Sequence, residues 1–315
     1  MRSRLIRQLC VASIAVLTLA ISPSAPRPAA LKLQPVASTG AWTQYHHDDA
    51  HTGTDTSVPT FTGVTTGWTS AAMDGEVFAE PLIFNGVVYA ATLQNTVYAF
   101  RQSDGVLQCS KNVGAPQTSG WGCGNISPTG ILGTPVIDTA ANRIYVVAEI
   151  TGTTPTYHLF GLDLANSGNV VFDTPITPTG FDWRIQQERA ALSLHGGFVY
   201  VPFGGRLGDC GSYNGWVVGV PTSGTGAPNV YKTADLGSGL WGPGGLAIDD
   251  ATGNVFGATG NGVAGGCATM GQNDSVVRLS PTLALQDFFA PQDWQANWCQ
   301  PDQDLGSAEP VLISS

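Results

Sequence analysis

Two groups of side chains in this sequence are suited to chemistry, and the first is a short run rich in histidine and aspartate. The run reads His46-His47-Asp48-Asp49 and is followed closely by His51. Imidazole and carboxylate groups are common ligands of zinc and other transition metals. In a β-strand alternate side chains point to the same face, so we expect His47, Asp49 and His51 to offer a metal site. The alternative is an exposed segment whose polar groups only satisfy turns.

The second group combines aromatic rings with charged and amide side chains. We expect these residues in loops at one end of a fold built from repeated sheets. Loops at that end open onto a central funnel, where ligands commonly bind. A ring of these residues suits a carbohydrate, a peptide or a planar cofactor equally well. In the alternative interpretation, an arginine–glutamate pair around Glu188 merely holds loops together. The candidate ligand-binding residues are Trp183, Arg184, Gln187, Arg189, Asp209, Tyr213, Trp216, Trp241, Asn261 and Asp274.

The chain lacks the signatures of several common enzyme classes. It contains no Gly-x-Ser-x-Gly elbow, no phosphate-binding loop, no His-Glu-x-x-His and no dinucleotide fingerprint. It also has no Cys-x-x-Cys, which argues against a thiolate zinc site or a redox motif. The sequence therefore assigns no catalytic residues.

The elements that must position these side chains repeat along the chain. An apolar strand ending in an aromatic residue recurs at Tyr89, Tyr145, Tyr200 and Phe256, at intervals of 56, 55 and 56 residues. Each anchor follows a short apolar run and a turn, as in a β-hairpin, and precedes a third and a fourth apolar strand. Four strands per repeat are typical of a β-propeller blade. A large β-sandwich with coincidental spacing is the alternative.

We therefore predict an all-β fold, a β-propeller of four-stranded blades. Four complete blades are expected near residues 76–114, 131–176, 187–233 and 241–291, and the start of a fifth from residue 305. A closed ring of seven or eight blades needs on the order of 400 residues. We expect an incomplete ring from a C-terminally truncated chain, whose fourth blade has an uncovered side and whose missing blades belong to a longer chain or to a partner.

The N-terminus has the features of a secretory signal peptide. Three arginines within the first seven residues precede an uncharged apolar stretch over residues 9–21. This stretch is too short to span a bilayer comfortably. We expect a signal peptide over residues 1–30, a linker over 31–41 and the propeller over 42–315, in a secreted, extracellular protein without a membrane span.

The net charge restricts the partners of the mature chain. Removing residues 1–30 deletes four arginines and no acidic residue, which takes the formal net charge from −10 to −14. Such a surface repels phosphate backbones. We therefore exclude nucleic acid and expect a small molecule, a carbohydrate or a protein as the partner.

Five cysteines follow the expected signal peptide, and export makes disulfides permissible. Cys109 and Cys123 would close a short loop at the end of the first blade, so we expect this pair. Loops of the fold could bring Cys210, Cys267 and Cys299 together. Because three cysteines cannot all pair with one another, one thiol must stay free or pair elsewhere.

The repeat resembles that of pyrroloquinoline quinone (PQQ)-type β-propellers, in which V-Y-x-G is followed by V-Y-A-L-D-x-x-T-G. The first blade carries Val88-Tyr89-Ala90-Ala91 and Val97-Tyr98-Ala99-Phe100, then Asp104-Gly105. The segment ahead of the blades, with Trp42, Tyr45, Asp48 and Thr52-Gly53, looks closest to secreted bacterial proteins with PQQ-binding-like repeats. Where such relatives tend to carry Ser-His-x-Asp, this chain has Gly205-Arg206-Leu207-Gly208-Asp209.

The resemblance implies a fold and candidate cofactors. Enzymes of this superfamily hold the quinone with a vicinal disulfide and a calcium ion bound by carboxylate and amide ligands. This chain has no adjacent cysteine pair, and Cys109 and Phe172 stand near the expected positions of the tryptophan that closes the family repeat. Our preferred interpretation is therefore a secreted ligand-binding or scaffold module, with PQQ and calcium as candidate cofactors. The alternatives are a PQQ- and calcium-dependent alcohol or sugar dehydrogenase of the quinoprotein type, and a polysaccharide-binding or polysaccharide-cleaving propeller.

Overall fold

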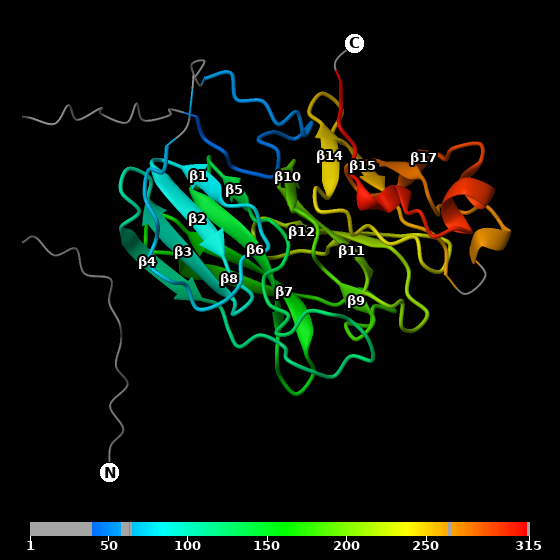
Figure 1. Cartoon of the computed structure of the whole chain (residues 1–315), viewed down its shortest axis with the longest axis horizontal. Coiled ribbons are helices and arrows are strands. Elements are labelled where there is room, and N and C mark those ends of the chain that lie inside the picture. Colours follow the sequence, from blue (N-terminus) through cyan, green and yellow to red (C-terminus); the bar gives the residue numbers. More distant parts are fainter. Residues whose placement is uncertain (1–39, 58–62, 64, 264–265, 314–315) are drawn as a thin grey trace, which may run out of the picture. The chain divides into compact units, whose positions relative to one another are not determined.

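The computed structural model describes residues 40–57, 63, 65–263 and 266–313. The expected signal peptide and nearly all of the linker lie outside these residues. The described chain is almost entirely β-structure, arranged as four antiparallel sheets of four consecutive strands each, and Figure 1 shows them in chain order from cyan to orange. The predicted all-β propeller fold with four-stranded blades is thereby confirmed. No helix among these residues is long and apolar enough to cross a membrane.

Strands within each sheet follow the order of the chain. The first sheet contains β1 (Leu82–Phe84), β2 (Val87–Ala91), β3 (Thr96–Arg101) and β4 (Leu107–Asn112). The second contains β5 (Val136–Asp138), β6 (Arg143–Ile150), β7 (Thr156–Asp163) and β8 (Asn169–Ile176). The third contains β10 (Ser193–His195), β11 (Phe198–Gly205), β12 (Trp216–Pro221) and β13 (Asn229–Lys232), and the short β9 (Gln186–Gln187) also pairs with β11. The fourth contains β14 (Leu246–Asp249), β15 (Asn254–Ala258), β16 (Val276–Leu279) and β17 (Leu285–Phe289).

Three short helical segments complete the described elements. They are the 3-10 helices η1 (Gly266–Ala268) and η3 (Leu305–Ser307) and the π-helical segment η2 (Trp294–Cys299). No strand is assigned among the described residues that follow η3, so the start of a fifth blade stays a prediction.

Turn residues close the hairpins as their sequence indicates. Asn85 and Gly86 join β1 to β2 with φ values of 50° and 72°. These left-handed conformations suit asparagine and glycine, and they match the twist of the two strands that the turn connects. Local turn chemistry therefore fixes the pairing of the inner strands.

Successive sheets pack against one another in series. The innermost strands β1, β5, β10 and β14 contact in that order. The first three aromatic anchors each pack against the next sheet: Tyr89 is buried between the first and second sheets, Tyr145 between the second and third, and Tyr200 between the third and fourth. Burying this apolar surface between sheets is what holds neighbouring blades together.

The fourth anchor, Phe256, has no sheet to pack against among the described residues. It lies on an open face of the fourth sheet together with Val276 and Phe289, and the Phe289 side chain is 68% exposed. Among the described residues, this face of the fourth sheet is therefore open, and the predicted truncation of the chain stays a prediction.

A segment that precedes the first sheet, residues 42–53, runs along the innermost strands, and we call it the leading segment. Trp42 exchanges two backbone hydrogen bonds with Ile83 of β1, at 2.7 and 2.8 Å. The amide of Ile137 in β5 donates to the Thr43 carbonyl at 2.8 Å, and that of Ile248 in β14 donates to the Asp49 carbonyl at 2.7 Å. The leading segment therefore joins the first, second and fourth sheets through backbone hydrogen bonds.

The disulfides differ from the predicted pairing. Cys123 is bonded to Cys210, and Cys267 is bonded to Cys299, so the expected bridge between Cys109 and Cys123 was wrong. Cys109 lies within β4, whereas the four disulfide-bonded cysteines lie outside the strands. The first bridge connects loop residues that are 87 positions apart, and the second connects η1 to η2 over 32 positions, so a search for short closed loops cannot find them.

A buried ion pair joins the second sheet to the third. The Nη2 atom of Arg206, just after β11, donates to both carboxylate oxygens of Glu149 in β6, at 2.8 and 2.9 Å, and neither side chain is exposed to solvent. The same atom donates to the Trp183 carbonyl at 3.0 Å, and the guanidinium lies 4.5 Å from the centre of the Trp121 ring. Burial raises the pKa of Glu149, although Arg206 acts in the opposite direction.

We expect Arg206→Met to lower the free energy of unfolding by about 3–5 kcal/mol, because it leaves the buried Glu149 carboxylate without a counter-charge. The double variant Glu149→Leu/Arg206→Met should recover most of this loss. Chemical denaturation measures both effects. Arg101→Met is the control, because the exposed pair of Arg101 with Asp104 contributes about 1 kcal/mol or less. Equal losses in the Arg101 and Arg206 variants would contradict this account.

Candidate functional site

Six of the predicted ligand-binding residues gather in loops at one end of the third and fourth sheets. Asp209 and Tyr213 follow the carboxyl end of β11, and Asn261 follows the carboxyl end of β15. Arg189 and Trp241 lie in the segments that lead into β10 and β14, and Asp274 precedes β16. In an antiparallel blade, the segment that enters the first strand and the loop between the second and third strands lie at the same end of the sheet. Residues of these segments in the third and fourth sheets therefore lie close together.

The centre of this group is a stacked arginine and tryptophan. The guanidinium of Arg189 lies 4.7 Å from the centre of the Trp241 ring. Burial lowers the pKa of Arg189, while Tyr213, Asp304 and Asp209 act in the opposite direction, so these groups surround the guanidinium. The Tyr213 hydroxyl donates to Asp209 at 2.8 Å.

Carboxylates from a third segment complete the group. The amide of Asn261 donates to Asp304 at 2.7 Å, and the Asn261 side chain donates to Asp302. Neither aspartate is among the sequence-predicted residues, because both lie in the connection that follows the fourth blade. The sequence could have indicated Asp302 and Asp304 only as acidic residues close to the expected start of a further blade.

Asp274 is the most deeply buried of these acids. Its Oδ1 accepts a hydrogen bond from the Leu305 amide at 3.2 Å, whereas its Oδ2 is buried and has no hydrogen-bond partner in the described chain. Burial raises the pKa of Asp274 to about 6, and the neighbouring Asp304 and Asp302 contribute to the increase. Burial also raises the pKa of Asp304.

We call this group the Trp241 site. Its members are Arg189, Asp209, Tyr213, Trp241, Asn261, Asp274, Asp302 and Asp304. Asp209 and Asp304 act on the Arg189 guanidinium, and Asp302 and Asp274 lie near Asp304, so the site has more carboxylates than cationic groups. Carboxylate and amide oxygens are the ligands that calcium prefers. The site therefore offers candidate oxygen ligands for a hard cation next to an aromatic ring, although its carboxylates do not form a group of three with ligand atoms all within 4.8 Å of one another.

The other four predicted ligand-binding residues lie elsewhere. Trp216 is buried in the core between the second and third sheets, and Gln187 is buried in β9. Trp183 is buried too, where its carbonyl accepts from Arg206. The exposed Arg184 lies over the Trp183 ring and pairs with Asp182. The structure does not bring these four into the Trp241 site.

The predicted arginine–glutamate pair is also different in the structure. Glu188 is fully buried and accepts a long hydrogen bond, 3.4 Å, from the Gly133 amide, and burial raises its pKa well above the usual range. The buried arginine–glutamate pair in the structure is the one between Arg206 and Glu149.

The structure does not gather His47, Asp49 and His51. The segment forms turns, and His47 and His51 have φ values of 77° and 60°, so strand alternation does not apply. Among the described residues, the cluster that offers three potential metal ligands consists of Asp49, His195 and Asp250. Burial, assisted by Asp250, raises the pKa of Asp49 to about 6.

No family model matches the chain, and no curated protein matches it. Solved structures do. A quinohemoprotein alcohol dehydrogenase from Comamonas testosteroni matches with a TM-score of 0.60 at 16% identity, over 81% of this chain and 41% of that one. The quinohemoprotein alcohol dehydrogenase ADHIIG from Pseudomonas putida HK5 matches with a TM-score of 0.59 at 15% identity, over 87% and 42%. A europium-containing methanol dehydrogenase matches with a TM-score of 0.50 at 12% identity, over 80% and 49%.

These matches show the fold and confirm the resemblance to PQQ-type β-propellers at that level. The chain spans between two fifths and one half of the length of these proteins. Identities this low carry no activity over to this chain, because the same fold supports many functions.

Asp274→Asn should flatten the pH dependence of stability between about pH 4 and pH 6. The unfolded carboxyl releases its proton near its ordinary pKa of 3.8, whereas the folded one retains it until about 6, so stability falls as the pH rises through this window. Removing the charge should therefore stabilise the protein at pH 7.5, by up to about 3 kcal/mol. Chemical denaturation in a chelating buffer measures this, with the exposed Asp287→Asn as the control. Parallel pH profiles for the wild type and Asp274→Asn would contradict the assignment.

Proposed function

We propose that this protein is a secreted β-propeller module that binds its ligand at the Trp241 site, with a calcium-like cation bound among the aspartates. The observation that carries the proposal is the buried Oδ2 of Asp274, which has no partner and lies near Asp302 and Asp304. A buried carboxylate oxygen without a donor is costly, and a bound cation removes that cost.

The aromatic part of the site favours a flat or polyhydroxylated ligand. Trp241 is half-buried and carries Arg189 against its ring, so an aromatic ring and a planar guanidinium lie together. Such a pair supplies apolar contact as well as hydrogen-bond donors to an anionic or carbonyl oxygen. The cation and Arg189 would then hold oxygens of the same ligand.

Export is part of the proposal. The N-terminal arginines and the apolar stretch over residues 9–21 have the pattern of a signal peptide. The two disulfides support this, because disulfides persist in oxidising compartments.

A quinoprotein-type oxidoreductase is the second candidate function, and the donor set of the Trp241 site favours it. Carboxylates and the Asn261 amide would hold the cation, and Trp241 would offer a surface for the planar PQQ. When bound, PQQ would supply the electron acceptor, with the cation polarising its quinone oxygens. The absence of adjacent cysteines in the sequence counts against this candidate.

Terbium luminescence tests the cation site, because an excited tryptophan transfers energy to a lanthanide bound nearby. We expect saturable terbium emission from the purified protein and its displacement by calcium. Asp304→Asn and Asp302→Asn should each weaken binding at least tenfold, or about 1.4 kcal/mol, because each removes a charged oxygen ligand. Asp287→Asn removes a carboxylate on the exposed face of the fourth sheet and should leave binding unchanged. Binding that none of these variants alters would overturn the proposed site.

Thermal melting with PQQ separates the two candidate functions. A quinone site predicts that PQQ raises the melting temperature only when calcium is present, and that Trp241→Ala abolishes this rise while calcium alone still stabilises the protein. If calcium raises the melting temperature and PQQ does not raise it further, the oxidoreductase is excluded and the binding module is supported.

A further inference from the structure

We propose that Asp49, His195 and Asp250 bind a divalent transition-metal ion, with zinc as the best match, and that this ion fastens the leading segment to the third sheet. The cluster lies at the opposite end of the strands from the Trp241 site. His195 ends β10 at the β10–β11 turn, and Asp250 lies in the β14–β15 turn, whereas the Trp241 site lies in the loops that follow β11 and β15.

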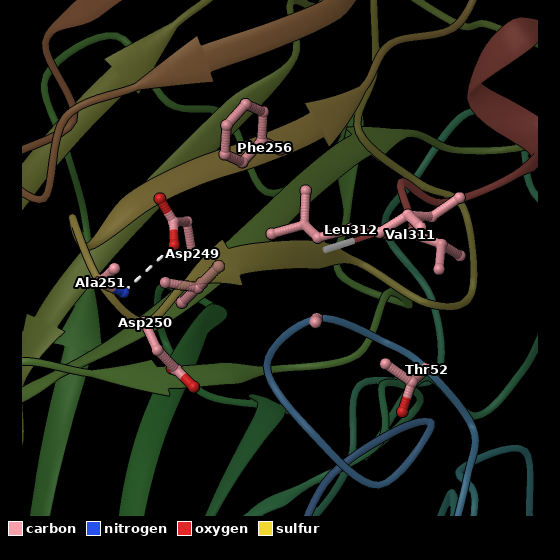
Figure 2. A pocket seen from close by; sticks show the side chains of 10 residues that line it. Thr52, Asp249, Asp250, Ala251, Phe256, Val311 and Leu312 are labelled. Carbon is pink, nitrogen blue, oxygen red and sulfur yellow. Dashed lines mark hydrogen bonds between the residues drawn. The ribbon is translucent and has the colours of Figure 1, made fainter. Parts of the chain in front are cut away.

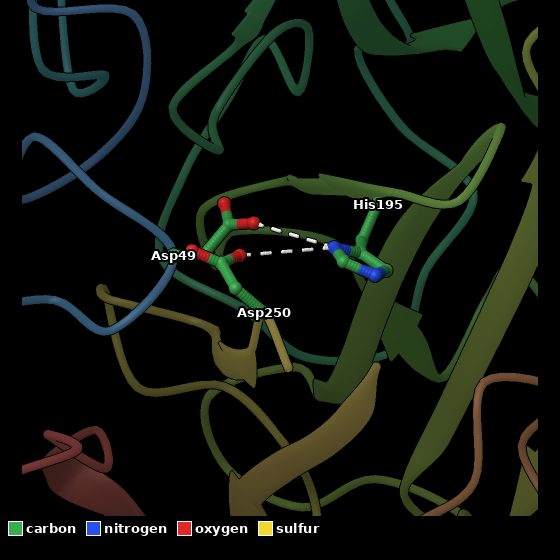
Figure 3. A group of neighbouring side chains, drawn as sticks. All are labelled: Asp49, His195 and Asp250. Atoms are coloured by element: carbon green, nitrogen blue, oxygen red, sulfur yellow. Dashed lines mark ion pairs between the residues drawn. The ribbon is translucent and has the colours of Figure 1, made fainter. Parts of the chain in front are cut away.

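The three side chains come from separate parts of the chain and point toward one another, as Figure 3 shows. The Nδ1 atom of His195 is 3.6 Å from Oδ2 of Asp49 and 3.8 Å from Oδ1 of Asp250. Zinc bonds of about 2.0–2.2 Å in a tetrahedral arrangement place neighbouring ligand atoms about 3.3–3.6 Å apart. The observed spacing is therefore close to that of a zinc site and needs only a small contraction.

The surroundings of Asp49 orient it as a ligand. Gln44 donates to Oδ1 of Asp49 at 2.6 Å, which leaves Oδ2 directed at His195. A hydrogen bond to the outer oxygen of a ligating carboxylate is a common supporting contact in metal sites. Two carboxylates with one imidazole also leave the cluster with a negative charge that a divalent ion balances.

An ion can reach this cluster from solvent. The Asp250 side chain is 80% exposed and borders an open pocket of about 790 Å³ between the leading segment, β14 and residues 311–313. Figure 2 shows Asp250 at this pocket with Thr52 and Leu312. An open side leaves room for water as a further ligand, which three protein ligands require.

The position of the cluster explains what the ion would do. The leading segment makes backbone hydrogen bonds to β1, β5 and β14, but the backbone hydrogen bonds of the described chain include none from this segment to β10. His195 is the last residue of β10, so a metal shared by Asp49 and His195 supplies the missing connection. All four inner strands would then be tied to one segment.

Calorimetric titration with zinc tests the proposal. We expect one zinc ion per chain, a higher melting temperature with zinc, and at least tenfold weaker binding in His195→Gln and in Asp250→Asn. His158→Gln is the matched control, because His158 also faces an aspartate, Asp173, but on the second sheet. Asp304→Asn should bind zinc normally, so failure of the Trp241 site and failure of this one are distinguishable.

Hydrogen exchange measures the fastening itself. Zinc should slow amide exchange in the leading segment of the wild type and leave it unchanged in Asp250→Asn. Because the Asp250 side chain is 80% exposed, this substitution removes a ligand and no core contact. Absence of saturable zinc binding, or equal binding in the wild type, His195→Gln and Asp250→Asn, would overturn the metal site. Zinc binding without slower exchange in the leading segment would overturn its fastening role.

Discussion

A fully buried ion pair between Arg206 and Glu149 joins the second sheet to the third at the point where the chain leaves β11. Two charges removed from water are tolerated only when their partners are well placed, and here Arg206 meets both carboxylate oxygens of Glu149 as well as the Trp183 carbonyl. The pair fixes the chain where it leaves β11, and the Cys123–Cys210 disulfide holds the same loop a few residues later. Asp209 and Tyr213 lie in this loop. The position of one side of the Trp241 site is therefore set by an interaction between two blades.

The two ends of the blades carry different chemistry. At the loop end, carboxylates and an amide from the third and fourth sheets and the following connection surround the stacked Arg189 and Trp241. At the turn end, the leading segment crosses the inner strands and brings Asp49 to His195 and Asp250. The first arrangement is suited to a ligand and a hard cation, and the second to a structural metal. Both sites form where neighbouring blades meet, because each repeat of such a fold contacts only its neighbours.

The fold could be predicted from sequence because its determinants are local and repeated. Alternating apolar residues, the anchors such as Tyr145 and turn pairs such as Asn85-Gly86 specify each sheet without reference to distant residues. Six of the eight residues of the Trp241 site could be predicted for the same reason, since equivalent loops of neighbouring blades converge. Asp302 and Asp304 were missed because they belong to a connection, and the disulfides because their partners meet only in three dimensions. The strand assumed around Asp49 failed because the flanking histidines adopt left-handed turn conformations.

Anomalous diffraction from crystals grown with terbium locates a cation bound in the Trp241 site. The account predicts an anomalous peak within about 2.3–2.6 Å of oxygens from Asp302, Asp304 and Asn261, with Asp274 Oδ2 directed toward it. Crystals that show no peak there, with terbium bound only to exposed carboxylates elsewhere, would contradict the account.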